Sequence, residues 1–385
     1  MKRIVVSCAS GLKNSGDEAL LEALLRSLGP EVDVFAISFD PEYTSAYHGI
    51  SSCAHGDISK KRKWIASCDL FIMGGGGLLQ DETSIFNVWL WISEIRLALS
   101  SGKRVLLYAN SIGPLNYAVN RYLVKQTLPR VTAMTLRDEI SLDLLTGMGI
   151  KKKAYLTMDP VFSSDSPSHE LVLKTNRKYC LPQKYHFFSV RHWYDTHPLI
   201  PVSVCSRLNL RTPANWHRYH RLTEELASVV RWINLTLGCP VVFGSFCTER
   251  DSKVAKDILK ILGGPNENRI IDDPFMRPLE MMAIMKGAEM VTGMRLHAAI
   301  YSMIVHQPFI AMVYSDKCRG LLSITDMECY GISVDAFNSK GWKKRYEMIR
   351  EEFDSIREKL SSISFHARER EKRNSDFLQN ILHDG

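Results

Sequence analysis

A cation and an imidazole lie two residues apart in the segment TGMRLHAAI, residues 292–300. A strand-like apolar run ends just before them, and the pattern predicts that a helix begins near Arg295. Arg295 and His297 would then lie at a helix N-terminus, where free backbone amides bind anions. An imidazole at this place can also move a proton near neutral pH. The segment therefore predicts an anion site with an acid–base group, and the alternative is a capped histidine with a surface arginine.

A second cation follows another predicted strand. Arg191 lies in SVRHW, residues 189–193, where the apolar run HFFSVR ends. Ligands of parallel α/β sheets bind beyond the carboxyl ends of the strands. A guanidinium there offers a fork that binds carboxylate or phosphate through two hydrogen bonds. Arg191 and Arg295 are therefore candidates for holding an anionic substrate.

Two glycine-containing turns follow predicted strands in the first half of the chain. GLKNSGDEA (11–19) places Asn14 and Asp17 at a helix start, where free amides can hold an anion. A tight turn with capping side chains would explain the same residues. MGGGGLLQDETS (73–84) contains four successive glycines, which let the backbone approach a ligand or another segment. It lacks G-x-G-x-x-G spacing and a Walker lysine, so it is not a standard nucleotide loop.

Further candidates lie around the glycines and at a later strand end. The glycine turn supplies Gly75, Gly76, Gln80 and Asp81, whose backbone and side chains could reach a ligand. Arg137 ends a buried strand beside an aspartate, and this arrangement is more often a structural ion pair than a binding site.

The elements that must position these residues are short apolar runs that alternate with amphipathic helical patterns. The runs are nearly continuous in Val, Ile, Leu and Phe, as in strands buried on both faces of a parallel sheet. The alternation predicts a doubly wound α/β fold. The predicted strands are 3–8, 33–39, 69–75, 104–110, 133–138 and 154–159 in the first half, and 186–191, 240–245, 269–272, 290–295, 308–314 and 330–335 in the second.

A polar segment with two prolines separates the two halves of the chain. In both halves apolar runs alternate with helical patterns. The sequence thus predicts two Rossmann-like domains facing a cleft, the architecture called GT-B in glycosyltransferases. The predicted parts are an N-terminal domain (1–165), a linker (166–184), a C-terminal domain (185–340) and a helical segment that packs back across the domains (341–385).

The stretch 192–222 has weak periodicity, which predicts a long irregular segment of the functional or disordered kind. Its aromatic and imidazole side chains suit sugar stacking and ordinary packing equally well. They are Trp193, Trp216, His217, Tyr219 and His220.

Composition is typical of a globular protein, with 45% hydrophobic and 24% charged residues and a net charge of +7. The mild positive charge suits anionic substrates or peripheral contact with the inner membrane surface, and it also suits a surface with a small Lys/Arg excess. Because no stripe of Lys and Arg is interleaved with aromatics, we expect no nucleic-acid partner.

Cysteine usage and hydropathy bear on the compartment. The nine cysteines are scattered without a C-x-x-C pair, which predicts reduced thiols and no metal site. The first apolar run is too short for a signal peptide, and no stretch approaches the ~18 apolar residues of a membrane span. We therefore expect a cytoplasmic protein, either free or peripheral at the cytoplasmic face of the membrane.

In their order along the chain, these motifs resemble those of the polysaccharide pyruvyl transferase family. The segments that carry the resemblance run from residue 11 to residue 317 and cover both halves. They are GLKNSGDEA, GGGLLQDETS, YANSIGP, LRDEIS, TMDP, SVRHW, GMRLHA and PFIAMVYSDK.

The resemblance implies a GT-B-like fold and an enzyme that uses phosphoenolpyruvate as donor substrate, without a cofactor. The acceptor would be a sugar of a surface polysaccharide, free or lipid-linked, and the product a pyruvate ketal. The R-L-H motif of the family is associated with donor binding, and it corresponds to Arg295, Leu296 and His297. The arginine of the S-V-R-x-W motif is Arg191.

The chemistry of ketal formation suggests roles for the candidates. We expect His297 to be the general acid and Asp17 or Asp81 to be the general base. The remaining candidates would bind substrate: Arg191, Arg295, Leu296, Asn14, Gly75, Gly76, Gln80 and Arg137. Two alternatives remain open, a GT-B glycosyltransferase that uses a nucleotide sugar and a non-catalytic glycan- or phosphate-binding module.

Overall fold

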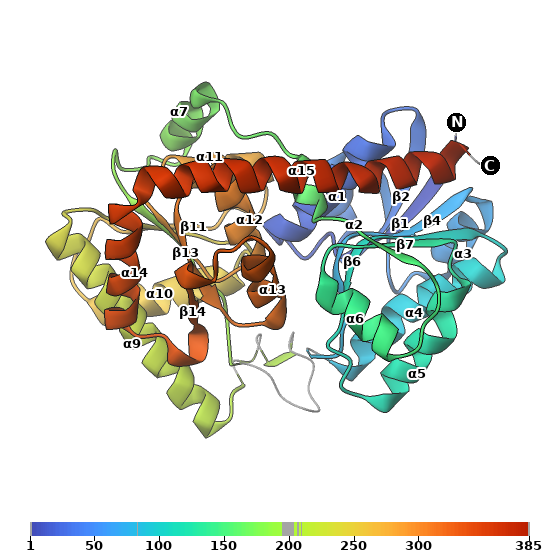
Figure 1. The fold of residues 1–385 in the computed structure, drawn as a ribbon, viewed down its shortest axis with the longest axis horizontal. Coiled ribbons are helices and arrows are strands. Elements are labelled where there is room, and N and C mark those ends of the chain that lie inside the picture. Colours follow the sequence, from blue (N-terminus) through green and yellow to red (C-terminus); the bar gives the residue numbers. More distant parts are fainter. Residues whose placement is uncertain (1, 83, 195–203, 206–207, 209, 384–385) are drawn as a thin grey trace. The chain divides into compact units, whose positions relative to one another are not determined.

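The computed structural model describes residues 2–82, 84–194, 204–205, 208 and 210–383, which form two compact α/β units (Figure 1). Unit 1 comprises residues 1–163 and 367–385, and unit 2 comprises residues 164–366. Each unit has its own parallel sheet with helices on both faces. The doubly wound α/β class with two Rossmann-like units, predicted from the sequence, is confirmed.

Unit 1 contains an eight-stranded sheet in the order β3-β2-β1-β4-β6-β7-β8, with β5 paired to β6. Every strand pair in it is parallel. The strands are β1 (Lys2–Ser7), β2 (Val32–Ser38), β3 (Ser51–Ala54), β4 (Leu70–Met73), β5 (Gly76–Leu79), β6 (Arg104–Ile112), β7 (Ala133–Leu136) and β8 (Ala154–Leu156). The helices are α1 (Ser15–Leu28), α2 (Pro41–His48), α3 (Ile58–Ser67), α4 (Ile85–Ser100), α5 (Ala118–Thr127) and α6 (Glu139–Gly147), with 3-10 turns at Leu128–Arg130 and Pro160–Ser163.

Alternate residues of these strands enter two separate cores, because successive side chains point to opposite faces. Val5 and Phe71 belong to the core that also holds Trp91 of α4 and Val124 of α5. Ile4, Leu70 and their equivalents belong to the other core, with leucines of α1 and of the last helix. Strands buried on both faces explain why the apolar runs of the sequence are nearly continuous.

Unit 2 contains a six-stranded parallel sheet in the order β11-β10-β9-β12-β13-β14. Its strands are β9 (His186–Ser189), β10 (Val241–Gly244), β11 (Arg269–Ile271), β12 (Val291–Gly293), β13 (Phe309–Val313) and β14 (Gly331–Ser333). Its helices are α7 (His169–Lys178), α9 (Pro213–Thr236), α10 (Arg250–Leu262), α11 (Pro278–Lys286), α12 (Leu296–Ile304), α13 (Asp316–Ile324) and α14 (Ser339–Glu351), with 3-10 turns at Glu328–Tyr330 and Val334–Ala336. The last helix, α15 (Phe353–His383), begins in unit 2 and ends in unit 1.

Two segments differ from what the sequence patterns indicate, and a third is helical as predicted. The interval 166–184, expected to be a linker, contains α7, which packs on α11 and groups with unit 2. The stretch 192–222 is not irregular throughout, because α9 begins at Pro213 with Thr212 as its N-cap; residues 195–203, 206–207 and 209 lie outside the described residues. The segment 341–385 is helical, and its residues divide between the two units.

None of the helices in the described part of the chain is both long enough and apolar enough to cross a membrane.

Candidate functional site

The strand order of unit 2 creates a switch point between β9 and β12. From β9 the chain continues to β10 and β11 on one side of the sheet, and from β12 it continues to β13 and β14 on the other. In such sheets ligands bind at the carboxyl ends of the two strands that flank this point. Arg191 lies two residues after β9, and Arg295 lies two residues after β12. The two predicted anion-binding arginines are therefore at the switch point of one sheet.

Arg295 is held by a buried carboxylate from the start of α10. Its Nε and Nη2 donate to the two oxygens of Asp251, at 3.0 and 2.5 Å. Asp251 is almost fully buried and also accepts a hydrogen bond from the backbone amide of Cys247, at 2.9 Å. Although burial lowers the pKa of Arg295, the charge of Asp251 outweighs it and raises that pKa above its ordinary value. Arg295 is thus a fixed cation with one defined orientation.

Arg191 is positioned by aromatic rings. Its guanidinium carbon lies 4.4 Å from the ring centroid of Tyr314 and 5.1 Å from that of Trp193. The two rings meet edge to face at 4.8 Å. Within the described residues the buried Nε of Arg191 has no hydrogen-bond partner. An unpaired buried donor costs free energy, so a ligand oxygen at this position would satisfy it.

Tyr314, at the end of β13, connects the two arginines electrostatically. Burial raises the pKa of its hydroxyl above the ordinary value, and the charges of Arg191 and Arg295 oppose this rise. Both cations therefore act on one half-buried phenol. The geometry is that of one cationic cluster at the carboxyl ends of β9, β12 and β13 rather than of two unrelated arginines.

His297 and Leu296 occupy the first turn of α12, directly after Arg295, as the sequence predicts. Both residues are half-buried. The imidazole lies 6.3 Å from the ring centroid of Tyr301, which in turn lies 5.3 Å from Phe246. The first amides of a helix have no intrahelical acceptor. The start of α12 thus combines a cation, an imidazole and amide donors, which suits an anion that must also receive a proton.

In unit 1 the structure brings Asn14 and Asp17 together at the start of α1. Asn14 is the N-cap of the helix, and its Oδ1 accepts a hydrogen bond from the amide of Gly16 at 3.2 Å. Its Nδ2 donates to the carboxylate of Asp17 at 2.7 Å. The two candidates therefore form one polar pair at the carboxyl end of β1.

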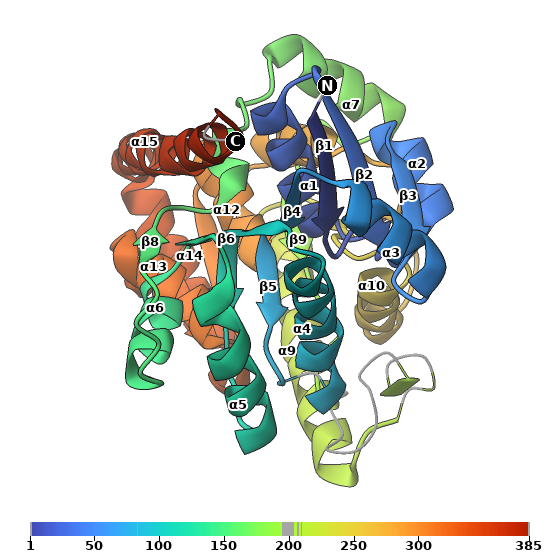
Figure 2. The same ribbon diagram turned by 90° about the vertical axis from the view of Figure 1, so that its right-hand side faces the viewer.

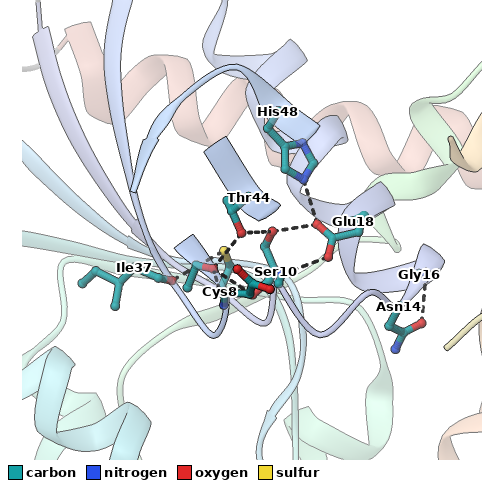
Figure 3. Close-up of polar contacts among 11 residues, drawn as sticks. Cys8, Ser10, Asn14, Gly16, Glu18, Ile37, Thr44 and His48 are labelled. Atoms are coloured by element: carbon teal, nitrogen blue, oxygen red, sulfur yellow. Dashed lines mark hydrogen bonds and ion pairs between the residues drawn. The ribbon is translucent and has the colours of Figure 1, made fainter. Parts of the chain in front are cut away.

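The loop that carries this pair is held by a buried carboxylate in the first turn of α1. Glu18 accepts hydrogen bonds from the hydroxyl of Ser10 at 2.6 Å and from the amide of Gly11 at 3.0 Å. His48 Nε2 lies 2.8 Å from the same carboxylate, and Thr44 joins the network through Ser10 (Figure 3). Because its partners come from three separate segments, this network fixes the turn between β1 and α1.

The glycines of the second turn allow close packing. A Cβ on Gly75 would lie 3.2 Å from Leu20 of α1, and Gly76 has φ +119°, a conformation that favours glycine. Asn110, on β6, donates to the backbone oxygens of residues 73, 74 and 108. These contacts hold the chain after β4 close to α1 and β6, and they favour a packing role for both glycines.

Hydrogen bonds and ion pairs join three further candidates to other segments of unit 1: Asp81, Gln80 and Arg137. Asp81 is buried and accepts hydrogen bonds from the amides of Asn116 and Tyr117, at 2.7 and 3.0 Å. The carboxylate therefore orders the loop before α5, and its role as a general base stays a prediction. The backbone oxygen of Gln80 accepts a hydrogen bond from α4. Arg137 forms a buried ion pair with Asp159 rather than with the adjacent Asp138, which is the N-cap of α6.

A second buried carboxylate lies beneath the carboxyl end of β1. Glu94 of α4 accepts hydrogen bonds from Ser7, His55 and Lys61, at 2.5, 3.0 and 2.8 Å. Burial raises its pKa, but the hydrogen bond and charge of His55, together with the bonds from Lys61 and Ser7, outweigh burial and lower the pKa below the ordinary value. The cluster is internally satisfied and joins β1, α3 and α4.

Comparison with known proteins identifies the family. The pattern of the polysaccharide pyruvyl transferases matches residues 14–316, which is more than half of the chain. The chain belongs to the polysaccharide pyruvyl transferase family. This pyruvyl transferase family member is also 25% identical over 241 residues to the amylovoran biosynthesis protein AmsJ of Erwinia amylovora. That match covers 58% of this chain and 52% of AmsJ, so it spans about half the length of the relative.

Solved structures share the fold of this pyruvyl transferase family member at low sequence identity. S. aureus MnaA, solved with UDP, superposes with a TM-score of 0.62 at 12% identity, covering 99% of this chain and 98% of that one. Anabaena Alr3699/HepE, also solved with UDP, gives 0.62 at 11% identity, and the UDP-GlcNAc 2-epimerase of Neisseria meningitidis gives 0.62 at 10%. Both cover 100% of each chain. These likenesses establish the GT-B-like fold.

Two residues of the cationic cluster were not predicted from the sequence. Asp251 lies 44 positions before Arg295, so no local pattern joins them. Tyr314 was visible only as the last residue of an apolar strand, although a tyrosine that ends a strand at a switch point is a signal that could have been used. Each of these residues contacts and positions one of the predicted arginines, so both belong to the cationic cluster.

Proposed function

We propose that this chain transfers pyruvate from phosphoenolpyruvate to two hydroxyl groups of one sugar, in a polysaccharide or its lipid-linked precursor, and releases phosphate. The observation that carries the proposal is the pair of fixed cations, Arg191 and Arg295, at the switch point of unit 2, with His297 beside the second. Phosphoenolpyruvate has a carboxylate and a phosphate, and two guanidinium groups can bind one each. The family and the role of AmsJ in amylovoran biosynthesis support a polysaccharide as the acceptor.

The proposed chemistry begins with proton transfer from His297 to the methylene carbon of phosphoenolpyruvate. The central carbon becomes electrophilic, a sugar hydroxyl attacks it, and its bond to the phosphate oxygen breaks. A second hydroxyl of the same sugar then closes the ketal ring. Of the two hydroxyl protons, one restores His297 and the other leaves with phosphate, so atoms and charge balance. The cation that binds the phosphate stabilises the charge that develops on it.

The same proposal assigns the acceptor to unit 1. Asp17 is the general base that takes a proton from the first sugar hydroxyl and returns it to the departing phosphate, and Asn14 orients Asp17. Gly75, Gly76 and Gln80 provide backbone and side-chain contacts. A reducing, cytoplasmic location accords with the nine cysteines, all of which are within the described residues and none of which forms a disulfide.

Donor binding is tested first by thermal stabilisation. A ligand that binds only the folded state stabilises it by about 2.7 kcal/mol at one hundred times its dissociation constant. Phosphoenolpyruvate should raise the melting temperature of the wild type and of Arg177→Ala, an exposed control on α7, but not of Arg191→Ala or Arg295→Ala. A rise with UDP- or GDP-sugars and none with phosphoenolpyruvate would replace the proposal with nucleotide-sugar glycosyl transfer.

Turnover is tested by phosphate release in the presence of acceptor polysaccharide. His297→Ala should retain the thermal shift with phosphoenolpyruvate and lose phosphate release. Asp17→Asn should lose most of it, whereas Asp143→Asn, an exposed control on α6, should not. Near-normal turnover in His297→Ala refutes its role as general acid. A wild type that binds phosphoenolpyruvate but never releases phosphate, with any acceptor tried, indicates a binding module.

A further inference from the structure

Four large aromatic side chains are exposed together on unit 1. Phe86 and Trp89 of α4 are 66 and 47% exposed, and Tyr117, the N-cap of α5, and Tyr122, within α5, are 38 and 62% exposed. Large aromatic residues on a protein surface are ordinarily isolated, whereas contiguous apolar patches mark interaction sites. We call these four residues the aromatic surface.

The two helices that carry the aromatic surface are neighbours and begin at the same place. The side-chain amide of Asn120, in α5, donates to the backbone oxygen of Ile85, the first residue of α4, at 3.0 Å. It also donates to Asp81, which accepts the amide of Tyr117. The starts of α4 and α5 are thus joined by hydrogen bonds, and the two helices run side by side (Figure 2). Phe86 and Trp89 are three residues apart on one exposed stripe of α4.

Exposed basic side chains lie on and just after the helix that carries Tyr122. Arg121 and Lys125 lie four residues apart on α5, on the stripe next to Tyr122, and both are exposed. Arg130 is exposed just after the helix. The nearest exposed acid in sequence is Glu82, before α4.

We propose that the aromatic surface docks on the interface of an anionic lipid bilayer. Tryptophan and tyrosine concentrate at membrane–water interfaces, where an apolar ring with a polar edge is favoured. Basic side chains beside such rings add attraction to anionic headgroups. A neutral sugar would use the rings but gains little from the basic side chains beside them. The charge therefore favours lipid over carbohydrate as the occupant.

The docking surface consists of residues of unit 1 and shares none with the cationic cluster of unit 2. The proposal that it binds lipid does not depend on phosphoenolpyruvate as the donor. The docking surface would keep the enzyme at a membrane where a lipid-linked acceptor resides. The two ideas can fail independently, because vesicle binding requires neither substrate nor turnover.

Sedimentation of the full chain with vesicles tests the proposal. Vesicles of phosphatidylcholine with phosphatidylglycerol should bind the wild type much more tightly than vesicles of phosphatidylcholine alone, and added salt should weaken the binding. Phe86→Ser combined with Trp89→Ser should weaken it by about a hundredfold, because each aromatic contributes roughly the free energy of a tenfold change when it leaves water. Lys125→Glu combined with Arg130→Glu should remove the preference for anionic vesicles.

A matched control replaces exposed apolar residues elsewhere. Leu235 on α9 and Phe365 on α15 are 79 and 63% exposed, and Leu235→Ser combined with Phe365→Ser should leave vesicle binding unchanged. Absence of binding by the wild type, or equal loss in this control, overturns the proposal. So does a dimer in size-exclusion chromatography that Phe86→Ser/Trp89→Ser converts to monomer without any change in vesicle binding, since a second copy would then cover the surface. The charge-reversal pair provides the answer if the serine variant does not fold.

Discussion

Neutralising Asp251 should destabilise unit 2 strongly, because this carboxylate is the counter-ion of Arg295. Asp251 is 1% exposed, and the side chain of Arg295 is 14% exposed. Removing one partner of a buried ion pair typically costs about 3–5 kcal/mol, since the other charge remains buried without compensation. Because Arg295 retains some contact with solvent, we expect the lower end of that range for Asp251→Asn, about 3 kcal/mol in the free energy of unfolding.

The assay is urea unfolding of the full chain, with hydrogen exchange of the β12–α12 segment as a local probe. The double variant Asp251→Asn/Arg295→Met has no unpaired cation and should be more stable than Asp251→Asn, which gives a coupling energy of at least about 1 kcal/mol. The exposed pair Asp316–Arg319 provides the control, and Asp316→Asn should cost less than about 1 kcal/mol. Equal costs at the two aspartates, or additive effects in the double variant, would refute the argument.

Three further predictions concern the described structure away from this pair. Gly293→Ala places a methyl group 2.7 Å from Cβ of Ala298, so α12 must shift, and we expect a loss of about 1–3 kcal/mol in urea unfolding together with loss of stabilisation by phosphoenolpyruvate. Burial raises the pKa of Glu371 to about 7, above its ordinary value of 4.5. The folded state therefore binds the proton more tightly, and stability falls as pH rises from 4.5 through 7. Glu371→Gln should add about 3 kcal/mol above that range and nothing below it, and unchanged pH dependence of unfolding in the variant would contradict this. Iodoacetamide should label Cys180 and Cys329 first in the native protein, because the other seven thiols are buried, and peptide mass spectrometry would reveal any different order.

The sequence predicted the strands that leave an apolar run, including three-residue strands, and it missed β3 and β5. All six strands of unit 2 were predicted from such runs, although the edge strands β11 and β14 are partly exposed. β3 was missed because its four residues, SSCA, are polar and partly exposed. β5 was missed because it begins with Gly76 and Gly77, which are typical of a turn.

Residues of the candidate site were predicted where the sequence pattern around them is informative, and they were missed where their role depends on a partner far away in the sequence. Arg191, Arg295 and His297 were found because each follows a predicted strand within a few residues. Asp251 binds Arg295 and Glu18 binds His48, and in each pair the partners are far apart in the sequence. No periodic pattern predicts such a pair. The start of α9 was predictable, since Thr212 followed by Pro213 is an ordinary helix N-terminus, but the aromatic residues after it obscured that signal.

Unit 1 consists of two separate chain segments, 1–163 and 367–385, and this has a consequence for its folding during translation. Leu378 and Leu382, near the end of α15, are buried in the same core as Ile4 of β1. Asn374 donates to the backbone oxygen of Met158 at 2.9 Å, and Gln379 donates to that of Ser27 at 2.7 Å. During translation, unit 2 is complete as a continuous segment once residue 366 has left the ribosome. Unit 1 begins first but must wait, with one face of its sheet incompletely covered, until the last residues emerge, so the half made first is the half that finishes folding last.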